Sequence, residues 1–550
     1  MLGEEGRRAR GAINMLETGD WTVLRQQGVV FPDRPPMANW LIALSALAGD
    51  GVDVLTIRLP SALAILALTL LIYEYCRRLL SRLTAIAAAA VFATFGQVLQ
   101  LGRTGESEVV FTLFIAGSLL LWHLGFAEGW PRAWPWSLGY AGAALGALVK
   151  GLQAPVYFVV IVCAFLIWKR RWRWLFGWQH GVGLAVFTAI VAAWQVPYYL
   201  ATDKQSSLDT WFGVVAPRLG LAGLLEHVAT YPLETFAALL PWSLVLPALA
   251  LPGIRRGLLE RRDHLAFVIV ALVVTYPTVW LAAGALPRYY MPLYPCVAIL
   301  VGALLDHLAT APTASSRRRL WHGFLAVAAS LAGIFGGLAG LVWLLEHESL
   351  VALRQSPPLT ALLLIAASLA VGAALRARSK SEPRAARVAL FTLAILFALV
   401  DSTLRTSLLA SRRQDLTPLV AAVRAALPEP DRLVSLSPVD PRFTYHYRHF
   451  IPELPWPTEL SDLPPDVDYF CFDRRPTDTA ESRYAERGMK VWSTPGTLPF
   501  AWEEIARVGV GPAVENPPSV AVIVGRVLRT ADGSPVPAIP SRPLQSPSPG

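Results

Sequence analysis

Charged residues are scarce in this chain. Aspartate, glutamate, lysine and arginine make up 16% of its 550 residues, whereas a soluble domain carries about a quarter. Hydrophobic residues make up 54% of the total. This composition argues against a soluble globular protein and favours one that lies largely in a membrane.

Cysteine is also scarce, with four in the whole chain. Their positions show neither the paired spacing of a disulfide framework nor the close spacing of a metal site. We expect no disulfide, and we expect the thiols to act as small apolar packing groups. The four are Cys76, Cys163, Cys296 and Cys471.

Long apolar runs are the feature that the sequence has in abundance. Runs of roughly 18–22 residues, enough to cross the hydrocarbon core of a bilayer, recur from about residue 59 to residue 408. They predict an all-α polytopic membrane domain. The predicted spans are 59–76, 84–102, 108–126, 135–150, 152–168, 181–200, 231–252, 265–284, 290–308, 322–345, 358–376 and 388–408.

Basic residues in the short loops give the expected orientation. Five loops carry clusters of arginine and lysine, at 77–82, 169–173, 255–262, 317–319 and 376–387. With the spans above, all five fall on one side of the membrane, which the positive-inside rule makes cytoplasmic. The clusters also account for the net charge of +9, so no nucleic-acid partner is needed.

The segments outside the spans are then expected on the extracytoplasmic face of the cell (inner or plasma) membrane. We expect residues 1–58 to form a loop with short interfacial helices. Residues 1–14 are charged and lack the apolar core of a secretory signal. Because no span precedes this outside loop, we expect a first membrane helix that the sequence as given lacks.

The composition becomes that of a soluble domain after about residue 409. We expect an extracytoplasmic α/β domain over 409–532, followed by a disordered tail rich in proline and serine over 533–550. A helix is predicted at 416–427 and strands, from their β-branched and aromatic content, at 434–436, 467–472, 489–492 and 520–527.

Ionisable residues gather where the predicted spans meet the extracytoplasmic face. Such groups cost several kcal/mol at membrane depth unless they are paired, so they are candidates for function. A carboxylate can take a proton from an acceptor hydroxyl or amine, and cations can hold a departing phosphate. This combination suggests glycosyl transfer from a polyprenyl-phosphate donor. The residues are Glu4, Glu5, Asp33, Glu106 and Glu108 with Arg7, Arg34, Arg103, Lys150, Arg218 and Arg288.

Several short motifs resemble, in order, those of the GT-C glycosyltransferases, in the branch of the protein O-mannosyltransferases and the lipid A aminoarabinose transferases. The resemblance covers roughly residues 1–310 and implies thirteen membrane helices, the twelve above and a missing first one. The motifs are Glu4-Glu5-Gly6-Arg7, the run 15–21, Asp33-Arg34-Pro35-Pro36, Arg58-Leu59-Pro60-Ser61, the run 103–108, Leu148-Val149-Lys150-Gly151, Pro241-Trp242-Ser243 and the run 287–292.

The resemblance implies roles for individual residues. Glu4 and Glu108 take the places of two catalytic-site aspartates and are one methylene longer. Glu4 is the implied general base or acceptor-orienting carboxylate, with Glu108 in support. Arg7, Arg34, Lys150 and Arg288 are implied to bind the donor phosphate. Further active-site positions are Glu5, Asp33, Arg103, Glu106 and Tyr289.

Part of the family also holds a divalent metal ion, which here would use Asp33 and His227. One carboxylate and one histidine are too few ligands for a metal site without water or substrate, and His227 does not have the expected spacing. Two other functions stay open: a non-catalytic scaffold with the same fold and a secondary transporter. A transporter would place charges near the midplane on broken helices, whereas here they crowd one face.

Overall fold

The computed structural model of the chain divides into two compact units. A helical unit comprises Leu2–Leu24 and Phe31–Ser411, and a sheet unit comprises Arg25–Val30 and Arg412–Gly550. The structure describes residues 5–32, 34–212, 223–260, 264–312, 315–341, 357–380, 382–410, 415–474, 497–510, 520–530 and 533–537.

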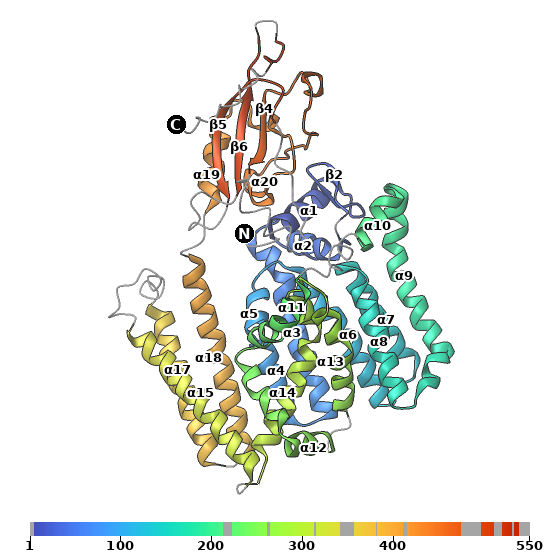
Figure 1. Cartoon of the computed structure of the whole chain (residues 1–550), viewed down its shortest axis with the longest axis vertical. Coiled ribbons are helices and arrows are strands. Elements are labelled where there is room, and N and C mark those ends of the chain that lie inside the picture. Colours follow the sequence, from blue (N-terminus) through green and yellow to red (C-terminus); the bar gives the residue numbers. More distant parts are fainter. Residues whose placement is uncertain are drawn as a thin grey trace, which may run out of the picture. The chain divides into compact units, whose positions relative to one another are not determined.

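The helical unit is a bundle with two short helices, α1 and α2, across one end (Figure 1). Its elements are α1 (Glu5–Thr18), α2 (Met37–Leu47), α3 (Val54–Leu79), α4 (Arg82–Ala93), α5 (Gly96–Leu101), α6 (Ser107–Ala127), α7 (Ala133–Lys150), α8 (Gln153–Trp168), η1 (Trp172–Phe176), α9 (Trp178–Ala201), α10 (Lys204–Phe212), α11 (Leu224–Ala238), η3 (Trp242–Ala250), α12 (Pro252–Glu260), α13 (Leu265–Trp280), η4 (Pro287–Leu293), α14 (Tyr294–Ala309), α15 (Ser316–Leu341), α17 (Pro357–Ser379) and α18 (Pro383–Ala410).

The predicted polytopic helical fold is confirmed. Within the described residues, seven helices are long and apolar enough to cross a membrane: α3, α6, α9, the continuous η4–α14 segment, α15, α17 and α18. The other predicted spans fall on shorter helices, and two of them are interrupted. The span predicted at 84–102 breaks between α4 and α5, and the one at 231–252 breaks between α11 and η3.

The segment η4–α14 is the core of the bundle. In its most apolar window 94% of the residues are buried, against 11% for α9 at the periphery. Helix α14 contacts α4 closely because Gly302 has no side chain, and a Cβ there would lie 2.6 Å from the Ala88 nitrogen. Small residues at such contacts let helix backbones approach, which is how membrane helices associate.

Polar contacts hold the ends of these helices. The side chain of Asp53 caps α3 by accepting a hydrogen bond from the Thr56 amide at 2.7 Å, and this bond lowers the pKa of Asp53. At the other end, Ser81 and Thr84 at the start of α4 donate to Asp306 Oδ2 at 2.6 and 2.8 Å. The last turn of α14 is thereby tied to the first turn of α4.

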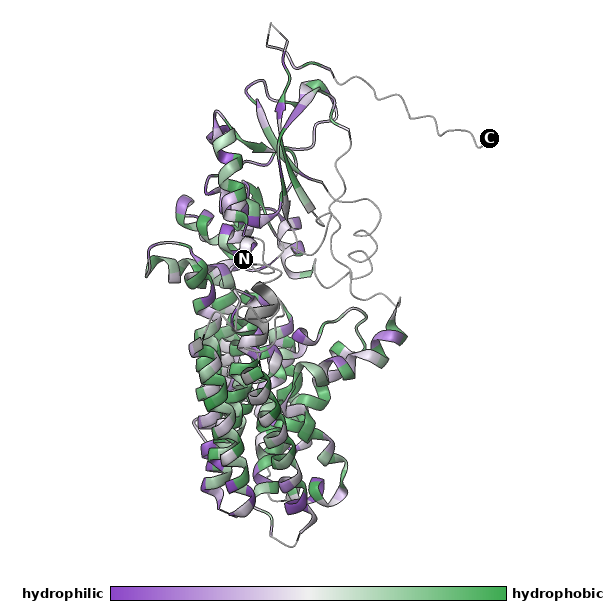
Figure 2. Cartoon of the chain, turned by 90° about the vertical axis from the view of Figure 1, so that its left-hand side faces the viewer, coloured by the Kyte–Doolittle hydropathy of each residue, from purple (hydrophilic) through white to green (hydrophobic). Residues whose placement is uncertain are grey.

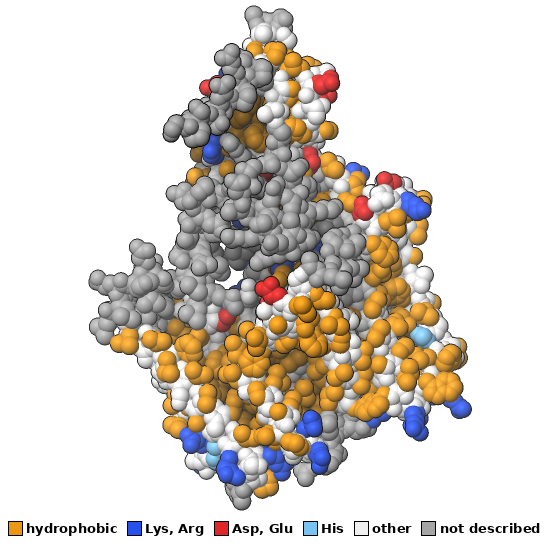
Figure 3. Space-filling view, viewed as in Figure 1, with side chains coloured by type: hydrophobic (Ala, Val, Ile, Leu, Met, Phe, Trp, Pro, Cys, Tyr) orange, Lys and Arg blue, Asp and Glu red, His pale blue; other side chains and the backbone are white. Residues whose placement is uncertain are grey.

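The surface of the helical unit is apolar along its length and charged at its ends. Figure 2 shows the bundle mostly hydrophobic between polar ends. Figure 3 shows lysine and arginine side chains gathered at the end away from α1 and α2. This is the pattern of a helical membrane protein, whose lipid-facing surface exposes apolar groups.

The sheet unit has the predicted α/β character. Its four-stranded sheet has the order β3-β4-β6-β5, with β3 parallel to β4 and the other pairs antiparallel. Helices α19 and α20 contribute Val420, Phe443 and Tyr447 to a core that includes Cys471 and Val524 of the sheet. The elements are α19 (Leu416–Ala426), β3 (Val434–Ser435), α20 (Pro441–Tyr447), β4 (Tyr469–Arg474), β5 (Trp502–Val510) and β6 (Val520–Val527).

The sheet unit differs from the sequence-based expectations at strand β5 and at residues 533–537. Strand β5 was not predicted, because Glu503, Glu504 and Arg507 give it the appearance of a polar loop. Residues 533–537, assigned in advance to a disordered tail, instead form bridges to the sheet region, with Pro535 opposite Arg529 and Pro537 opposite Phe500. The strand predicted at 489–492 and the rest of the tail lie outside the described residues.

A hairpin from the N-terminal region completes the sheet unit. Strands β1 (Arg25–Gln26) and β2 (Val29–Val30) are joined at Gly28, whose φ of 89° favours glycine. The side chain of Gln27 donates to Ser435 Oγ at 2.6 Å, and the Gln27 carbonyl accepts from the Glu453 amide at 3.0 Å. Residues separated by some 400 positions thus belong to one unit.

The close contact at Gly302 gives a test of the helix packing. We expect Gly302→Val to lower the free energy of unfolding by about 2 kcal/mol, because the added carbons force α14 away from the Ala88 backbone. Gly333→Val in α15 is the control, since a Cβ there meets nothing within 4 Å. Thermal unfolding of the two variants in detergent measures the difference, and equal midpoints would contradict this packing account.

Candidate functional site

Four segments of the helical unit bring charged side chains together. Glu108 lies in the first turn of α6, Lys150 is the last residue of α7, and Arg288 lies in the first turn of η4. Arg34 precedes α2 and is within electrostatic range of both Glu108 and Lys150. These are four of the residues predicted from the sequence, and the bundle places them at the α1–α2 end.

A buried ion pair forms the centre of this site. Lys150 Nζ lies 2.8 Å from Glu108 Oε1, and the two side chains are 7% and 6% exposed. Arg288 Nε approaches the same oxygen at 3.7 Å. The other oxygen, Oε2, is buried and makes no hydrogen bond with any described residue. One oxygen of the carboxylate therefore interacts with two cations. The other oxygen can accept a hydrogen bond from a further donor.

Aromatic rings and a glycine turn position the lysine. Its Nζ lies 4.9 Å from the ring centre of Tyr289 and 5.7 Å from that of Phe111, distances at which a ring face attracts a cation. Gly151 ends α7 with a φ of 90°, so the turn that follows Lys150 favours glycine at position 151. Gln153, which the sequence did not single out, donates to the Tyr289 carbonyl at 3.3 Å.

Among the residues that the structure describes, three cations and two carboxylates make up this cluster. Lys150, Arg288 and Arg34 surround Glu108, and Glu106 is within electrostatic range of Arg288. Buried cations persist at low dielectric when they are paired or when an anion joins them. An anion with several acceptor oxygens, such as a phosphate, is a chemically suitable ligand for a group of lysine and arginine side chains.

Glu5 is a buried clamp between three segments. It begins α1 and is fully buried, and its two oxygens accept hydrogen bonds from Arg58 Nε and Nη2 at 2.7 and 3.0 Å. The Gly105 amide donates to Glu5 Oε1 at 3.1 Å. A Cβ at Gly105 would lie 2.4 Å from Ile57 Cγ2, so this segment can pack against α3 beside Glu5 because residue 105 is glycine.

A second contact joins α1 and α2 to the start of α6. Arg8 Nη2 donates to Ser107 Oγ at 3.1 Å, and Asn39 Nδ2 donates to the Arg8 carbonyl at 3.0 Å. Arg8 and Asn39 are both buried. Neither was predicted to contribute to the site, although a polar Asn39 in the apolar stretch after Pro36 was a signal in the sequence. These contacts orient the residue that immediately precedes Glu108.

Other predicted residues have partners outside the ion-pair cluster. Arg103 forms an ion pair with Asp401 of α18 at 2.7 Å, a residue that the sequence did not indicate. The Arg7 guanidinium lies over the Phe31 ring at 5.4 Å. The carbonyl of Glu106, itself buried, accepts from Ser61 Oγ at 3.3 Å. Glu4, Asp33 and Arg218 lie outside the described residues.

Of the two residues considered for a metal ion, His227 lies in the described part of the chain and Asp33 does not. His227 Nε2 donates to the Val279 carbonyl at 3.1 Å and its ring lies 4.8 Å from that of Tyr231. No group of three His, Cys, Asp or Glu with metal-binding geometry occurs among the described residues. The contacts of His227 are those of a hydrogen-bonded, packed side chain.

Sequence comparisons identify proteins that are similar to this chain. A family model described as dolichyl-phosphate-mannose-protein mannosyltransferase matches residues 33–196. The undecaprenyl phosphate-alpha-4-amino-4-deoxy-L-arabinose arabinosyl transferase of Pseudomonas aeruginosa is 29% identical over 320 residues, or 56% of each chain. The enzyme of the same name from Edwardsiella ictaluri is 28% identical over 56% of this chain and 55% of that protein. The chain thus matches about half the length of these curated relatives.

Comparison of structures extends the likeness to the whole fold. The crystal structure of ArnT from Cupriavidus metallidurans bound to undecaprenyl phosphate has a TM-score of 0.67, with 15% identity over 95% of this chain and 93% of that one. Its apo state has a TM-score of 0.65, with 16% identity over 94% and 93%. The helical bundle and the small sheet unit together have the GT-C fold of these structures.

The clamp at Glu5 gives a test of the site architecture. We expect Glu5→Gln to lower the free energy of unfolding by about 2 kcal/mol, because a charge-assisted pair with Arg58 is lost in a buried place. Glu17→Gln is the control, since Glu17 is exposed at the other end of α1. The measurements are thermal unfolding in detergent and hydrogen exchange of the Gly105 amide. A wild-type unfolding midpoint and a wild-type exchange rate in both variants would disprove the clamp.

Proposed function

We propose that this chain, a member of the GT-C superfamily that holds the protein O-mannosyltransferases and the aminoarabinose transferases, transfers a sugar from a polyprenyl-phosphate donor to an acceptor. The observation that carries the proposal is the grouping of Lys150, Arg288 and Arg34 around buried Glu108, at the end of the bundle where α1 and α2 lie. The acceptor is a lipid, a glycan or a protein that presents a hydroxyl or an amine.

The cations are assigned to the donor phosphate. When the acceptor oxygen or nitrogen bonds to the anomeric carbon, the bond from that carbon to the phosphate oxygen breaks. Polyprenyl phosphate leaves with increased negative charge, and Lys150, Arg288 and Arg34 stabilise this charge from fixed positions. Arg7, on α1, is assigned to the same group from the family motif.

The two carboxylates receive different roles. Glu108 Oε1 already faces Lys150 and Arg288, so we assign Glu108 to positioning these cations, with Oε2 available to a hydroxyl of the substrate. Glu4 is assigned as the base that takes the acceptor proton. That assignment depends on the family motif, since Glu4 lies outside the described residues.

The proposed site faces the extracytoplasmic side. The basic loops lie at the opposite end of the bundle, and the positive-inside rule makes that end cytoplasmic. A structural relative is bound to undecaprenyl phosphate, and the named sequence relatives transfer a pentose from this carrier. An undecaprenyl-phosphate pentose is therefore the first donor to test.

The phosphate role predicts loss of donor affinity. Lys150→Met should weaken binding of undecaprenyl phosphate by about tenfold to a hundredfold, because one charge-assisted contact is lost. Lys204→Met, at an exposed position in α10, should leave it unchanged. Arg34→Gln serves as a second variant, since Arg34 lies outside the helices, in the segment that precedes α2, and its loss is expected to spare the fold. If titration of purified protein shows wild-type affinity in both Lys150→Met and Arg34→Gln, the phosphate assignment is wrong.

The positioning role of Glu108 depends on its charge. Glu108→Gln should lower turnover by about tenfold to a hundredfold and weaken donor binding, because Lys150 loses its counter-charge. Glu108→Asp keeps the charge and should retain more of both. Transfer from a labelled undecaprenyl-phosphate sugar separates turnover from apparent donor affinity. Wild-type turnover in Glu108→Gln would contradict this role.

A further inference from the structure

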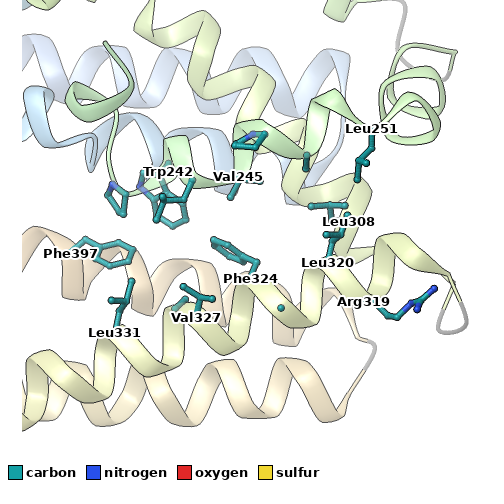
Figure 4. Close-up of a pocket in the computed structure, with 16 residues that line it drawn as sticks. Trp242, Val245, Leu251, Leu308, Arg319, Leu320, Phe324, Val327, Leu331 and Phe397 are labelled. Carbon is teal, nitrogen blue, oxygen red and sulfur yellow. The ribbon is translucent and has the colours of Figure 1, made fainter. Parts of the chain in front are cut away.

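An apolar groove runs along the bundle outside the site described above. It has a volume of about 500 Å³ and lies between η3, the end of α14, α15 and α18. Figure 4 shows its lining side chains, with Trp242 and Phe397 at one end and Arg319 at the other. The proposed transfer reaction makes no use of these residues.

The groove is open to the surroundings of the bundle. Val327, Leu244 and Leu251 in its lining are 55%, 50% and 47% exposed. Gly323 of α15 leaves a further gap, because a Cβ there would meet nothing within 4 Å. In a membrane protein such an opening between helices is filled by hydrocarbon, because water gains no hydrogen bonds from apolar walls.

Polarity is confined to one end of the groove. At the end of the groove opposite Arg319, the side chain with a polar group is that of Trp242. Its Nε1 donates to Thr94 Oγ1 at 2.8 Å, and Thr94 does not line the groove. Arg319, an exposed residue in the first turn of α15, is the charged side chain of the lining. The groove therefore presents a cationic mouth and an apolar body.

The length of the groove matches one leaflet of a bilayer. Arg319 and Leu331 lie twelve positions apart on α15, which is about 18 Å at the helical rise. Half of the hydrocarbon core is about 15 Å. A chain that entered at Arg319 and followed α15 would thus end near the middle of the membrane, as a phospholipid acyl chain does.

The mouth lies at the opposite end of the bundle from the proposed donor site. Arg288 is the second residue of the 23-residue segment Pro287–Ala309, and Leu308, which lines the groove, is the last but one. About 30 Å separates these two positions along the helix. A polyprenyl phosphate with its phosphate at Lys150 and Arg288 cannot also present that phosphate to Arg319.

We infer that the groove binds an anionic glycerophospholipid of the cytoplasmic leaflet, with its phosphate at Arg319 and one acyl chain along α15. Basic pockets between membrane helices on the cytoplasmic side are a recognised setting for anionic head groups. The inference goes beyond the proposed transfer reaction, because its ligand is neither donor nor acceptor and its site uses none of the same residues.

Native mass spectrometry of the full chain tests this site. The purified protein is delipidated and titrated with phosphatidylglycerol or with phosphatidylcholine. We expect one phosphatidylglycerol to be retained in preference to phosphatidylcholine. Gly323→Leu should abolish this retention, because Gly323 lines the groove at a position where a Cβ meets nothing within 4 Å, so the added side chain can occupy the groove. Arg319→Gln should weaken it about fivefold, the effect of one surface cation on an anionic lipid.

Matched controls distinguish the groove from the general surface. Gly333→Leu adds the same side chain to α15 outside the groove, and Arg384→Gln removes an exposed arginine outside the lining. Both should retain the lipid as the wild type does. Equal retention by Gly323→Leu and Gly333→Leu would overturn the inference, as would displacement of the lipid by undecaprenyl phosphate. Lipid retention and its displacement are both measured without transfer activity. The inference about the groove can therefore fail while the proposed function holds, and the reverse.

Discussion

The buried ion pair of Lys150 and Glu108 is the interaction on which the charged end of the helical unit depends. Each group alone would be costly to remove from water, and their attraction offsets this cost only at close range, here 2.8 Å. The pair joins the start of α6 to the end of α7, and it gives Arg288 a carboxylate to approach. Lys150 and Arg288 thus lie at the same carboxylate oxygen, and this grouping of cations is suited to an anion with several acceptor oxygens.

The short helices α1 and α2 belong to the same electrostatic arrangement. Glu5 is buried against Arg58 and the Gly105 amide, and Arg8 reaches Ser107, so both contacts hold the segment that leads into Glu108. The two ends of the bundle are thus built for different tasks. One carries paired, buried charges that suit chemistry on a phosphate, whereas the other carries exposed arginines that suit a membrane surface.

Most of the fold was predictable because a membrane span has a required length and composition. In the described part of the chain the predicted spans fall largely on helices, two of them interrupted, and Glu108, Lys150 and Arg288 were found from the cost of placing charge at membrane depth. The partners of the predicted residues were not found. Asp401 lies some 300 positions from Arg103, and Gln27 pairs with a domain some 400 positions away, distances over which a periodic pattern carries no information.

The sequence by itself determined that this is a helical membrane protein, which of its ends is basic, and which residue types could act on a lipid-linked phosphate, because these follow from composition and local pattern. The tertiary structure decided which charges meet. Glu5, a candidate for the active site, has both oxygens committed to Arg58 and Gly105, whereas Glu108 keeps one oxygen without a hydrogen bond to any described residue. Pairing between charges depends on where helices pack, and packing depends on contacts such as Gly302 against Ala88 that no charge pattern records.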